Sequence, residues 1–232
     1  HLLSFLKERF PSITSLLYCI NNKGNDSLYD QNIFCFYGQN YITEHLGKLQ
    51  FKITAKSFYQ TNPKQAETLY AIGMKFANLK GSETVYDLYT GTGTIALSIA
   101  NSCAKVVGVE SVPEAIDAAI ENAIFNKIEN TSFEVGDMKD CFNDEFVERH
   151  GKADVVITDP PRNGMHTDVI KQLLKLGPEK IVYISCNSAT QARDLELMKN
   201  DYSVLKSQAV DMFPQTHHVE NVVLLQRNEI NE

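Results

Sequence analysis

The sequence has no cysteine pair spaced as CxxC and no apolar run long enough to cross a membrane. Its five cysteines are an odd number and are widely scattered, which excludes the regular spacing of a disulfide framework, a zinc knuckle or an iron–sulfur cluster in this chain. His1-Leu2-Leu3 does not open a signal peptide. These absences predict a cytoplasmic protein with no metal site in this chain, in which one of the reduced thiols is free to do chemistry.

Positive charge is also scarce, since 22 Lys and Arg residues stand against 29 Asp and Glu residues and give a formal net charge of −7. A nucleic-acid binder normally presents a basic face to the phosphates, so the overall charge gives no support to such a partner. The chain begins without methionine, in what reads as the middle of a folded segment. We therefore expect a more basic part of the protein to lie outside this sequence.

Residues 1–62 have the pattern of a small β-rich piece. Apolar residues at helical spacing predict a first helix that stops at Pro11. Short strands joined by polar turns are predicted at residues 15–20, 32–37 and 48–53. We interpret this piece as a fragment of a larger domain.

Strands and helices alternate from residue 63 to residue 232. The predicted strands are residues 84–88, 105–110, 132–135, 154–158, 181–185, 202–210 and 221–226. The predicted helices begin at Pro63 and then cover residues 94–101, 113–126, 139–149, 167–175 and 189–199. This alternation predicts an α/β fold with a doubly wound, mostly parallel sheet. Ligands bind such sheets beyond the carboxyl ends of the strands.

A glycine turn joins the first strand of this sheet to the helix that follows. Gly91 and Gly93 allow a tight turn there and let a ligand approach the backbone amides at the helix start. Alone, such a turn serves packing as readily as nucleotide binding. Glu110, however, ends the second strand, where a carboxylate can accept hydrogen bonds from both hydroxyls of a ribose. The third glycine of the GxGxxG pattern is missing, which disfavours a pyrophosphate and favours S-adenosylmethionine.

Two further acids follow strands of the same sheet. Asp137 comes after the third strand, in a position to accept a hydrogen bond from an adenine amino group. Asp159 ends the fourth strand and is followed by two prolines, whose fixed φ angles make a rigid, extended crevice wall. Both acids are therefore candidates for the cofactor site.

Cys186 follows the strand at residues 181–185 and precedes a new helix. An unpaired cysteine is more often a small apolar residue packed at a strand end than a working thiol. A thiol at the carboxyl end of a strand can instead face a ligand crevice. The glycine turn and the acids point to the same crevice, so we favour the working thiol.

Five motifs together resemble the S-adenosylmethionine-dependent RNA 5-methyluridine methyltransferases. They are residues 57–62, residues 87–93, residues 159–164, residues 185–188 with 192–194, and residues 211–220. The similarity runs from Gln39 to Leu225. It implies a Rossmann-like class I methyltransferase fold, S-adenosylmethionine as cofactor, and an RNA substrate of the transfer or ribosomal class.

The resemblance also implies roles for single residues. Cys186 would be the nucleophile and Glu220 the base. Members of the family often have asparagine where this chain has Thr94. The candidate cofactor-binding residues are Gln60, Tyr89, Gly91, Gly93, Thr94, Glu110, Asp137 and Asp159.

The chemistry explains why a thiol and a carboxyl group would be needed. Carbon 5 of uracil is a poor nucleophile until the Cys186 thiolate adds to carbon 6 and turns the ring into an enolate. A base must then remove the proton from carbon 5 so that the thiol can leave, and Glu220 is the candidate. Only the thiolate adds, so we expect the pKa of Cys186 to be lowered, with the helix start after it as the cause.

Three other functions compete with this interpretation. Amino-group methyltransferases also place an acid-Pro-Pro motif at the fourth strand, but usually with an aromatic residue next, where this chain has Arg162. A cytosine carbon-5 enzyme is a closer competitor and is distinguished by Glu220 and Asn187. A non-catalytic RNA-binding module would not be expected to keep both Cys186 and Glu220.

The resemblance also suggests what surrounds this chain. Family members commonly carry an amino-terminal oligonucleotide-binding barrel, and some carry an iron–sulfur cluster, and neither is visible here. We therefore expect residues 1–62 to be the end of a central RNA-binding domain and residues 63–232 to be the methyltransferase domain.

Overall fold

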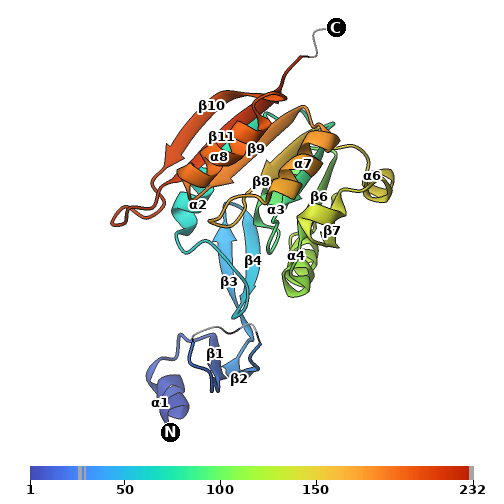
Figure 1. Ribbon diagram of the computed structural model, residues 1–232. Coiled ribbons are helices and arrows are strands. Elements are labelled where there is room, and N and C mark those ends of the chain that lie inside the picture. The colour runs from blue at the N-terminus through green and yellow to red at the C-terminus, as the bar shows by residue number, and fades with distance from the viewer. Residues whose placement is uncertain (26–27, 29, 230–232) are drawn as a thin grey trace.

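The computed structural model describes residues 1–25, 28 and 30–229, and its centre is a seven-stranded sheet (Figure 1). In sheet order the strands are β10 (Tyr202–Val210), β11 (Glu220–Arg227), β9 (Lys180–Ser185), β8 (Val155–Thr158), β5 (Thr84–Leu88), β6 (Lys105–Glu110) and β7 (Thr131–Val135). Strands β5 to β9 are parallel, whereas β11 is antiparallel to β9 and to β10. The predicted doubly wound, mostly parallel sheet is confirmed.

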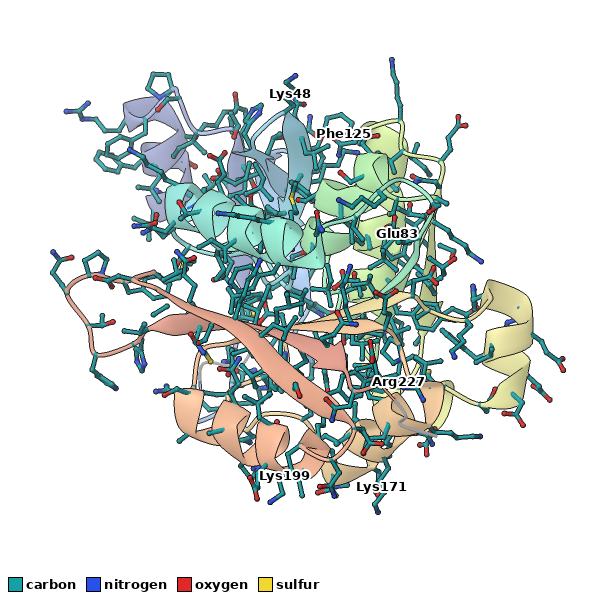
Figure 2. The ribbon with its side chains drawn as sticks, turned by 90° about the horizontal axis from the view of Figure 1, so that it is seen from above. Lys48, Glu83, Phe125, Lys171, Lys199 and Arg227 are labelled. Carbon is teal, nitrogen blue, oxygen red and sulfur yellow. The ribbon has the colours of Figure 1, made fainter. Side chains whose placement is uncertain are left out.

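Helices cover both faces of the sheet, because successive side chains of a buried strand point to opposite faces and both sets are apolar here. Val85 belongs to one core and its neighbour Tyr86 to the other. Figure 2 shows the two helical layers, with Lys48 and Phe125 on one side of the sheet and Lys171 and Lys199 on the other. One layer contains α2 (Pro63–Ala77), α3 (Thr94–Ile99) and α4 (Pro113–Phe125), and the other contains α5 (Met138–Cys141), α6 (Asp144–His150), α7 (Thr167–Leu176) and α8 (Ser188–Met198).

One predicted helix is wrong. Residues 139–149 were expected to form a single helix, but they form α5 and α6 with a break at Phe142 and Asn143. The side chain of Asn143 accepts a hydrogen bond from the backbone N–H of Phe146 at 2.9 Å and so begins a new helix. Asparagine competes for backbone hydrogen bonds in this way, which favours a cap over a helix interior.

A hairpin of β3 (Tyr41–Leu46) and β4 (Leu49–Thr54) packs on the layer of α2 and α4. Leu46, Phe51 and Ile53 join the core on that side of the sheet, and Phe51 is completely buried. The sequence did not indicate β3, since Glu44 and His45 break its apolar pattern and its pairing with β4 defines it. The hairpin precedes residue 62 in the chain, yet it shares the core of the sheet.

Three elements near the start of the chain lie apart from the sheet (Figure 1). They are α1 (Leu2–Arg9) and the antiparallel pair β1 (Ser15–Cys19) and β2 (Ile33–Gly38), close to the predicted positions. No residue of α1 is buried, and Leu2 and Phe5 are more than half exposed. A two-stranded sheet of this kind is only marginally stable alone. The division of the chain at residue 62 stays a prediction.

Candidate functional site

The carboxyl ends of the parallel strands meet at one edge of the sheet, and β11 begins at the same edge because it runs the other way. Four residues that end or directly follow different strands therefore lie at the same edge as the first residue of a fifth strand. These residues are Tyr89 after β5, Glu110 at the end of β6, Asp159 after β8, Cys186 after β9 and Glu220 at the start of β11.

Cys186 and Glu220 lie near each other at the ends of neighbouring strands. Ser185 and Asn221 are the last pair in the antiparallel ladder of β9 and β11, and Cys186 and Glu220 are the next residues beyond it. The charge of Glu220 raises the pKa of the Cys186 thiol, as expected for side chains near each other. The two residues lie far apart along the chain, and this register brings them together.

The thiol and the nearby carboxyl groups are partly or largely removed from water, and this sets their charges. Burial raises the pKa of Glu220, whose exposed fraction is 7%. Burial, the charge of Glu220 and the charge of Asp87 together raise the pKa of Asp159 to about 8. Asp159 is therefore protonated at neutral pH in the absence of a bound cation.

The expected lowering of the Cys186 pKa is wrong for this structure. Burial, then Glu220 and Asp159, raise the pKa of the thiol, and the opposing effect of Arg162 is smaller. The start of α8 does not reverse this, because the side chain of Asn187 already accepts hydrogen bonds from two of its first N–H groups. The resting thiol is protonated at neutral pH.

The glycine turn has a backbone that only a few residue types adopt. Tyr89, Gly91 and Gly93 have φ angles of 62°, 54° and 83°. A Cβ atom at Gly93 would also lie 3.2 Å from Cβ of Ala119 and 3.3 Å from Cζ of Phe133. Glycine is required at position 93 both for its φ angle and for this close approach.

Glu110 is held against the turn. Its Oε2 accepts a hydrogen bond from the N–H of Gly91 at 3.3 Å. Its Oε1 accepts hydrogen bonds from the N–H and hydroxyl of Ser111 and from the N–H of Val112, at 2.7, 3.0 and 3.1 Å. Each carboxylate oxygen has about two lone-pair sites, and Oε2 accepts only the bond from Gly91 among the described residues, so it keeps the capacity to accept another from a ligand.

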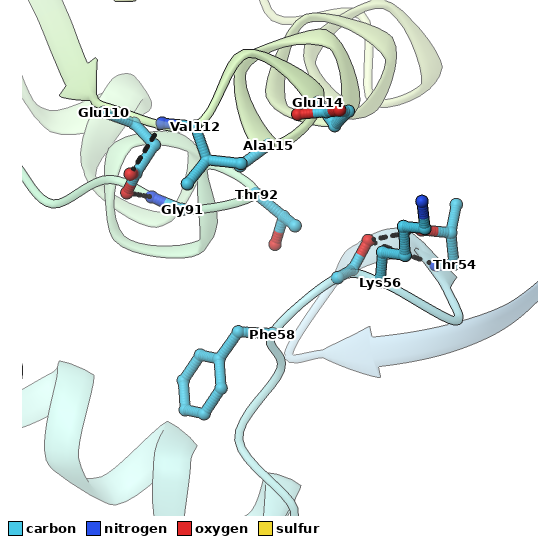
Figure 3. Close-up of a pocket in the computed structure, with 10 residues that line it drawn as sticks. Thr54, Lys56, Phe58, Gly91, Thr92, Glu110, Val112, Glu114 and Ala115 are labelled. Atoms are coloured by element: carbon cyan, nitrogen blue, oxygen red, sulfur yellow. Dashed lines mark hydrogen bonds between the residues drawn. The ribbon is translucent and has the colours of Figure 1, made fainter. Parts of the chain in front are cut away.

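A cavity of about 110 Å³ lies between the turn and the segment that follows β4 (Figure 3). Gly91, Thr92 and Glu110 line one side of it, and Phe58 lies on the other with an exposed fraction of 74%. The hydroxyl of Thr92 points toward the cavity, yet it is buried and has no hydrogen-bond partner among the residues that the structure describes. A buried hydroxyl of this kind favours a polar ligand atom beside it.

Sequence reasoning missed some of these residues. A threonine between two glycines carries no binding signal of its own, so the sequence did not indicate Thr92. The sequence also gave no sign that Asp87, at the end of the first strand, is fully buried below the turn. It accepts hydrogen bonds from Oγ1 of Thr90 at 2.6 Å and from the N–H of Ala96 at 3.0 Å, while its Oδ1 has no partner in the part of the chain that the structure describes. Burial is the main cause that raises its pKa to about 7.

Of the eight predicted cofactor residues, Gly91 and Glu110 line this cavity, and the other six do not: Gln60, Tyr89, Gly93, Thr94, Asp137 and Asp159. Asp137 caps α5 through the N–H of Lys139 and pairs with the Lys139 ammonium at 3.0 Å. Thr94 begins α3, and its side chain is hydrogen-bonded to Tyr70. Gln60 is half-buried in the segment between β4 and α2.

Within residues 1–25, 28 and 30–229, no group of three or more His, Cys, Asp and Glu side chains is arranged to hold a metal ion. None of the helices described there combines the length and the apolar character that crossing a membrane requires. All five cysteines are free thiols.

Comparison with protein families gives one match that covers most of the chain. The family described as tRNA (uracil-5-)-methyltransferase matches residues 33–228. A Porphyromonas gingivalis protein described as an uncharacterized RNA methyltransferase is 58% identical over 98% of this chain and 49% of its own length. A Bacteroides thetaiotaomicron protein with the same description is 55% identical over 97% and 50%. The chain thus spans about half the length of these relatives.

Solved structures agree with this match. The Pyrococcus abyssi tRNA (uracil-54, C5)-methyltransferase, solved in complex with S-adenosyl-L-homocysteine, superposes with a TM-score of 0.81 and 33% identity. The alignment covers 94% of this chain and 52% of that one. Trm5b of the same organism superposes with a TM-score of 0.69 over 97% of this chain and 67% of its own, at 15% identity. The second likeness concerns the fold alone.

Proposed function

Because the chain belongs to the tRNA (uracil-5-)-methyltransferase family, we propose that it carries the catalytic part of an enzyme that methylates carbon 5 of a uridine in RNA. The methyl donor would be S-adenosylmethionine, and the route would pass through a covalent bond between Cys186 and carbon 6 of the uracil. The observation that carries this proposal is that Cys186 and Glu220 lie near each other at the ligand-binding edge of the sheet, directly beyond the last pair of the β9–β11 ladder.

The residues at this edge fit a cationic nucleoside cofactor. Asp87 is fully buried and Asp159 is half-buried, both carboxyl groups have raised pKa values, and a positive charge beside them would favour their ionised forms. Glu110 can accept hydrogen bonds from ribose hydroxyls, and the hydroxyl of Thr92 has no partner of its own. When bound, S-adenosylmethionine supplies an electrophilic methyl group. We also propose roles for Gln60, Tyr89, Gly91, Gly93, Thr94 and Asp137 in binding it.

Cys186 starts the reaction. Its thiol must lose a proton, and the carboxylate of Glu220 near it is a suitable acceptor because a raised pKa makes Glu220 a stronger base. The thiolate then forms a bond to carbon 6, and the electrons of the carbon 5–carbon 6 double bond move to the carbonyl at carbon 4 as an enolate. The enolate makes carbon 5 nucleophilic enough to accept the methyl group.

Glu220 finishes the reaction. After methyl transfer, carbon 5 carries both the new methyl group and its original hydrogen. Removal of that proton by Glu220 restores the carbon 5–carbon 6 double bond and breaks the bond from carbon 6 to the Cys186 sulfur. Before this step, Glu220 must therefore release the proton that it accepted from Cys186, either to solvent or to another group.

The RNA must expose its uridine to this edge, because carbon 5 lies inside a base-paired stack. Such enzymes flip the target base into the site. The structural relative from Pyrococcus abyssi acts on transfer RNA, and we propose transfer or ribosomal RNA as the substrate class here. A cytoplasmic site of action is part of the proposal and is supported by the free thiols.

Mass-spectrometric mapping of 5-methyluridine tests the proposal. Total RNA from cells with the full-length protein should contain a 5-methyluridine that is missing from cells lacking it, and re-expression should restore the modification. A Cys186→Ala protein made at the same level should not restore it. An unchanged 5-methyluridine map after loss of the protein would contradict the proposed function.

A further inference from the structure

The outer edge of β4 is paired with side chains instead of with another strand. β3 and β4 form a sheet of two strands, so the second edge of β4 presents its backbone groups to α4. Asn126 accepts a hydrogen bond from the N–H of Gln50 at 2.9 Å and donates one from Nδ2 to the Gln50 carbonyl at 2.7 Å. One helical turn earlier, Asn122 accepts a hydrogen bond from the N–H of Lys52 at 2.9 Å. The two amides tie the hairpin to α4.

Asn122 has a second partner in the glycine turn. Its side chain is completely buried, and its Nδ2 donates a hydrogen bond to the carbonyl of Thr92 at 3.2 Å. Thr92 stands between the two glycines and lines the cavity together with Glu110. The N–H of Lys52 needs an acceptor and the carbonyl of Thr92 needs a donor, and an asparagine amide supplies both. One side chain therefore joins the hairpin to the wall of the cavity.

From this arrangement we infer that Asn122 is a positioning residue, which makes the affinity of the glycine turn for the cofactor depend on the docking of the β3–β4 hairpin. The inference rests on the proposed function, in which S-adenosylmethionine occupies this edge of the sheet. Asn122 acts only through the backbone of Thr92. A shift of that carbonyl moves Gly91, whose N–H is bonded to Glu110, and thereby changes the groups that would face the ribose.

Two isosteric substitutions separate this role from a merely structural one. Asn122→Asp keeps an acceptor for Lys52 but places an oxygen against the carbonyl of Thr92. Asn126→Asp creates the same defect against the carbonyl of Gln50, at the end of the same helix and at the same strand edge. The side chain of Asn126 is hydrogen-bonded to Gln50 and to the carbonyl of Asn122, and within the described residues it has no hydrogen bond to the turn. Asn122→Ala and Asn126→Ala repeat the comparison without a new charge.

Calorimetric titration of the full-length proteins with S-adenosylhomocysteine, below the melting temperature of every variant, measures the dissociation constants to be compared. We expect the dissociation constant to rise about tenfold or more for Asn122→Asp and to stay within twofold for Asn126→Asp, although both variants melt earlier. Equal affinities for the wild type and Asn122→Asp, or equal losses in both variants, would overturn the inference. Wild-type protein that binds no S-adenosylhomocysteine would instead show that the cofactor assignment is wrong, and the inference would fall with it.

Hydrogen exchange of the wild-type protein tests the same link without any variant. Coupling between two sites is reciprocal, so a ligand that fixes the turn must also stabilise the hairpin. Saturating S-adenosylhomocysteine should slow the exchange of the Lys52 amide at least severalfold. Unchanged exchange at Lys52, with slower exchange at Gly91, would contradict the inference.

Discussion

The charge state of Asp159 makes a testable contribution to stability. Its pKa is raised to about 8 from an ordinary value of 3.8, chiefly by burial and then by Glu220 and Asp87. Between these two pH values the folded protein keeps a proton that the unfolded chain releases. The contribution to stability is therefore greatest below pH 3.8 and is lost as the pH rises to about 8. Asp159→Asn removes the titrating group and should remove this loss.

The size of the effect follows from the linkage of protons to folding. One proton bound only by the folded state lowers stability by about 1.4 kcal/mol per pH unit, or about 3 kcal/mol between pH 5 and pH 7. Asp159 is incompletely buried, and solvent screening reduces the value, so we take about half of it. A loss of roughly 1–2 kcal/mol lowers the melting temperature of a protein of this size by roughly 3–6 °C.

Thermal melting without cofactor at pH 5 and pH 7 measures this effect. The fall in melting temperature from the lower to the higher pH should be smaller in Asp159→Asn than in the wild type by roughly 3–6 °C. Asp117→Asn, which makes the same change at an exposed position on α4, should follow the wild type. Parallel melting curves for the wild type and Asp159→Asn would refute the reasoning.

Other predictions concern the reaction and the turn. Glu220→Gln removes the base that takes the proton from carbon 5, so with substrate RNA it should still form the covalent adduct but release it at least about a hundredfold more slowly, as quenched-flow gel analysis would show. In the wild type, the rate of adduct formation should increase by up to about tenfold per pH unit between pH 7 and pH 9, because the resting thiol is protonated. A rate that does not change with pH would contradict this. Gly93→Ala should cost about 1–3 kcal/mol in denaturant unfolding, since its Cβ meets Ala119; no loss would contradict the close contact.

The order of the sheet elements could be read from the sequence because each buried strand is an apolar run bounded by helix signals. β5, β6 and β10 have the predicted bounds, and most other elements differ by one or two residues. β3 could not be found in this way, since its polar residues carry no strand pattern and only β4 beside it makes it a strand. The break at Asn143 was also not predicted, because the overall pattern of the segment favours one helix and a single capping side chain divides it.

The sequence identified residue types at the site better than their electrostatics. Cys186 stood out because a thiol follows a strand signal, and Glu220, which precedes the last predicted strand, because of the family resemblance; the ladder of β9 and β11 then brings the two residues near each other. The pKa of Cys186 could not be judged from its place before a helix, since three-dimensional packing puts Glu220 and Asp159 beside it. The bond from Asn122 to Thr92 likewise joins segments that no local pattern connects.

The central claim is that Cys186 forms a covalent bond to the uracil ring, and 5-fluorouridine provides the most direct measurement. Fluorine at carbon 5 cannot leave as a proton does, so the adduct should accumulate after methyl transfer. Mass spectrometry of the full-length protein, incubated with 5-fluorouridine-substituted RNA and S-adenosylmethionine and digested under denaturing conditions, should find the methylated nucleotide on the peptide that contains Cys186. A wild-type protein that methylates unsubstituted RNA but gives no such peptide, or a Cys186→Ala protein that still methylates carbon 5, would contradict the account.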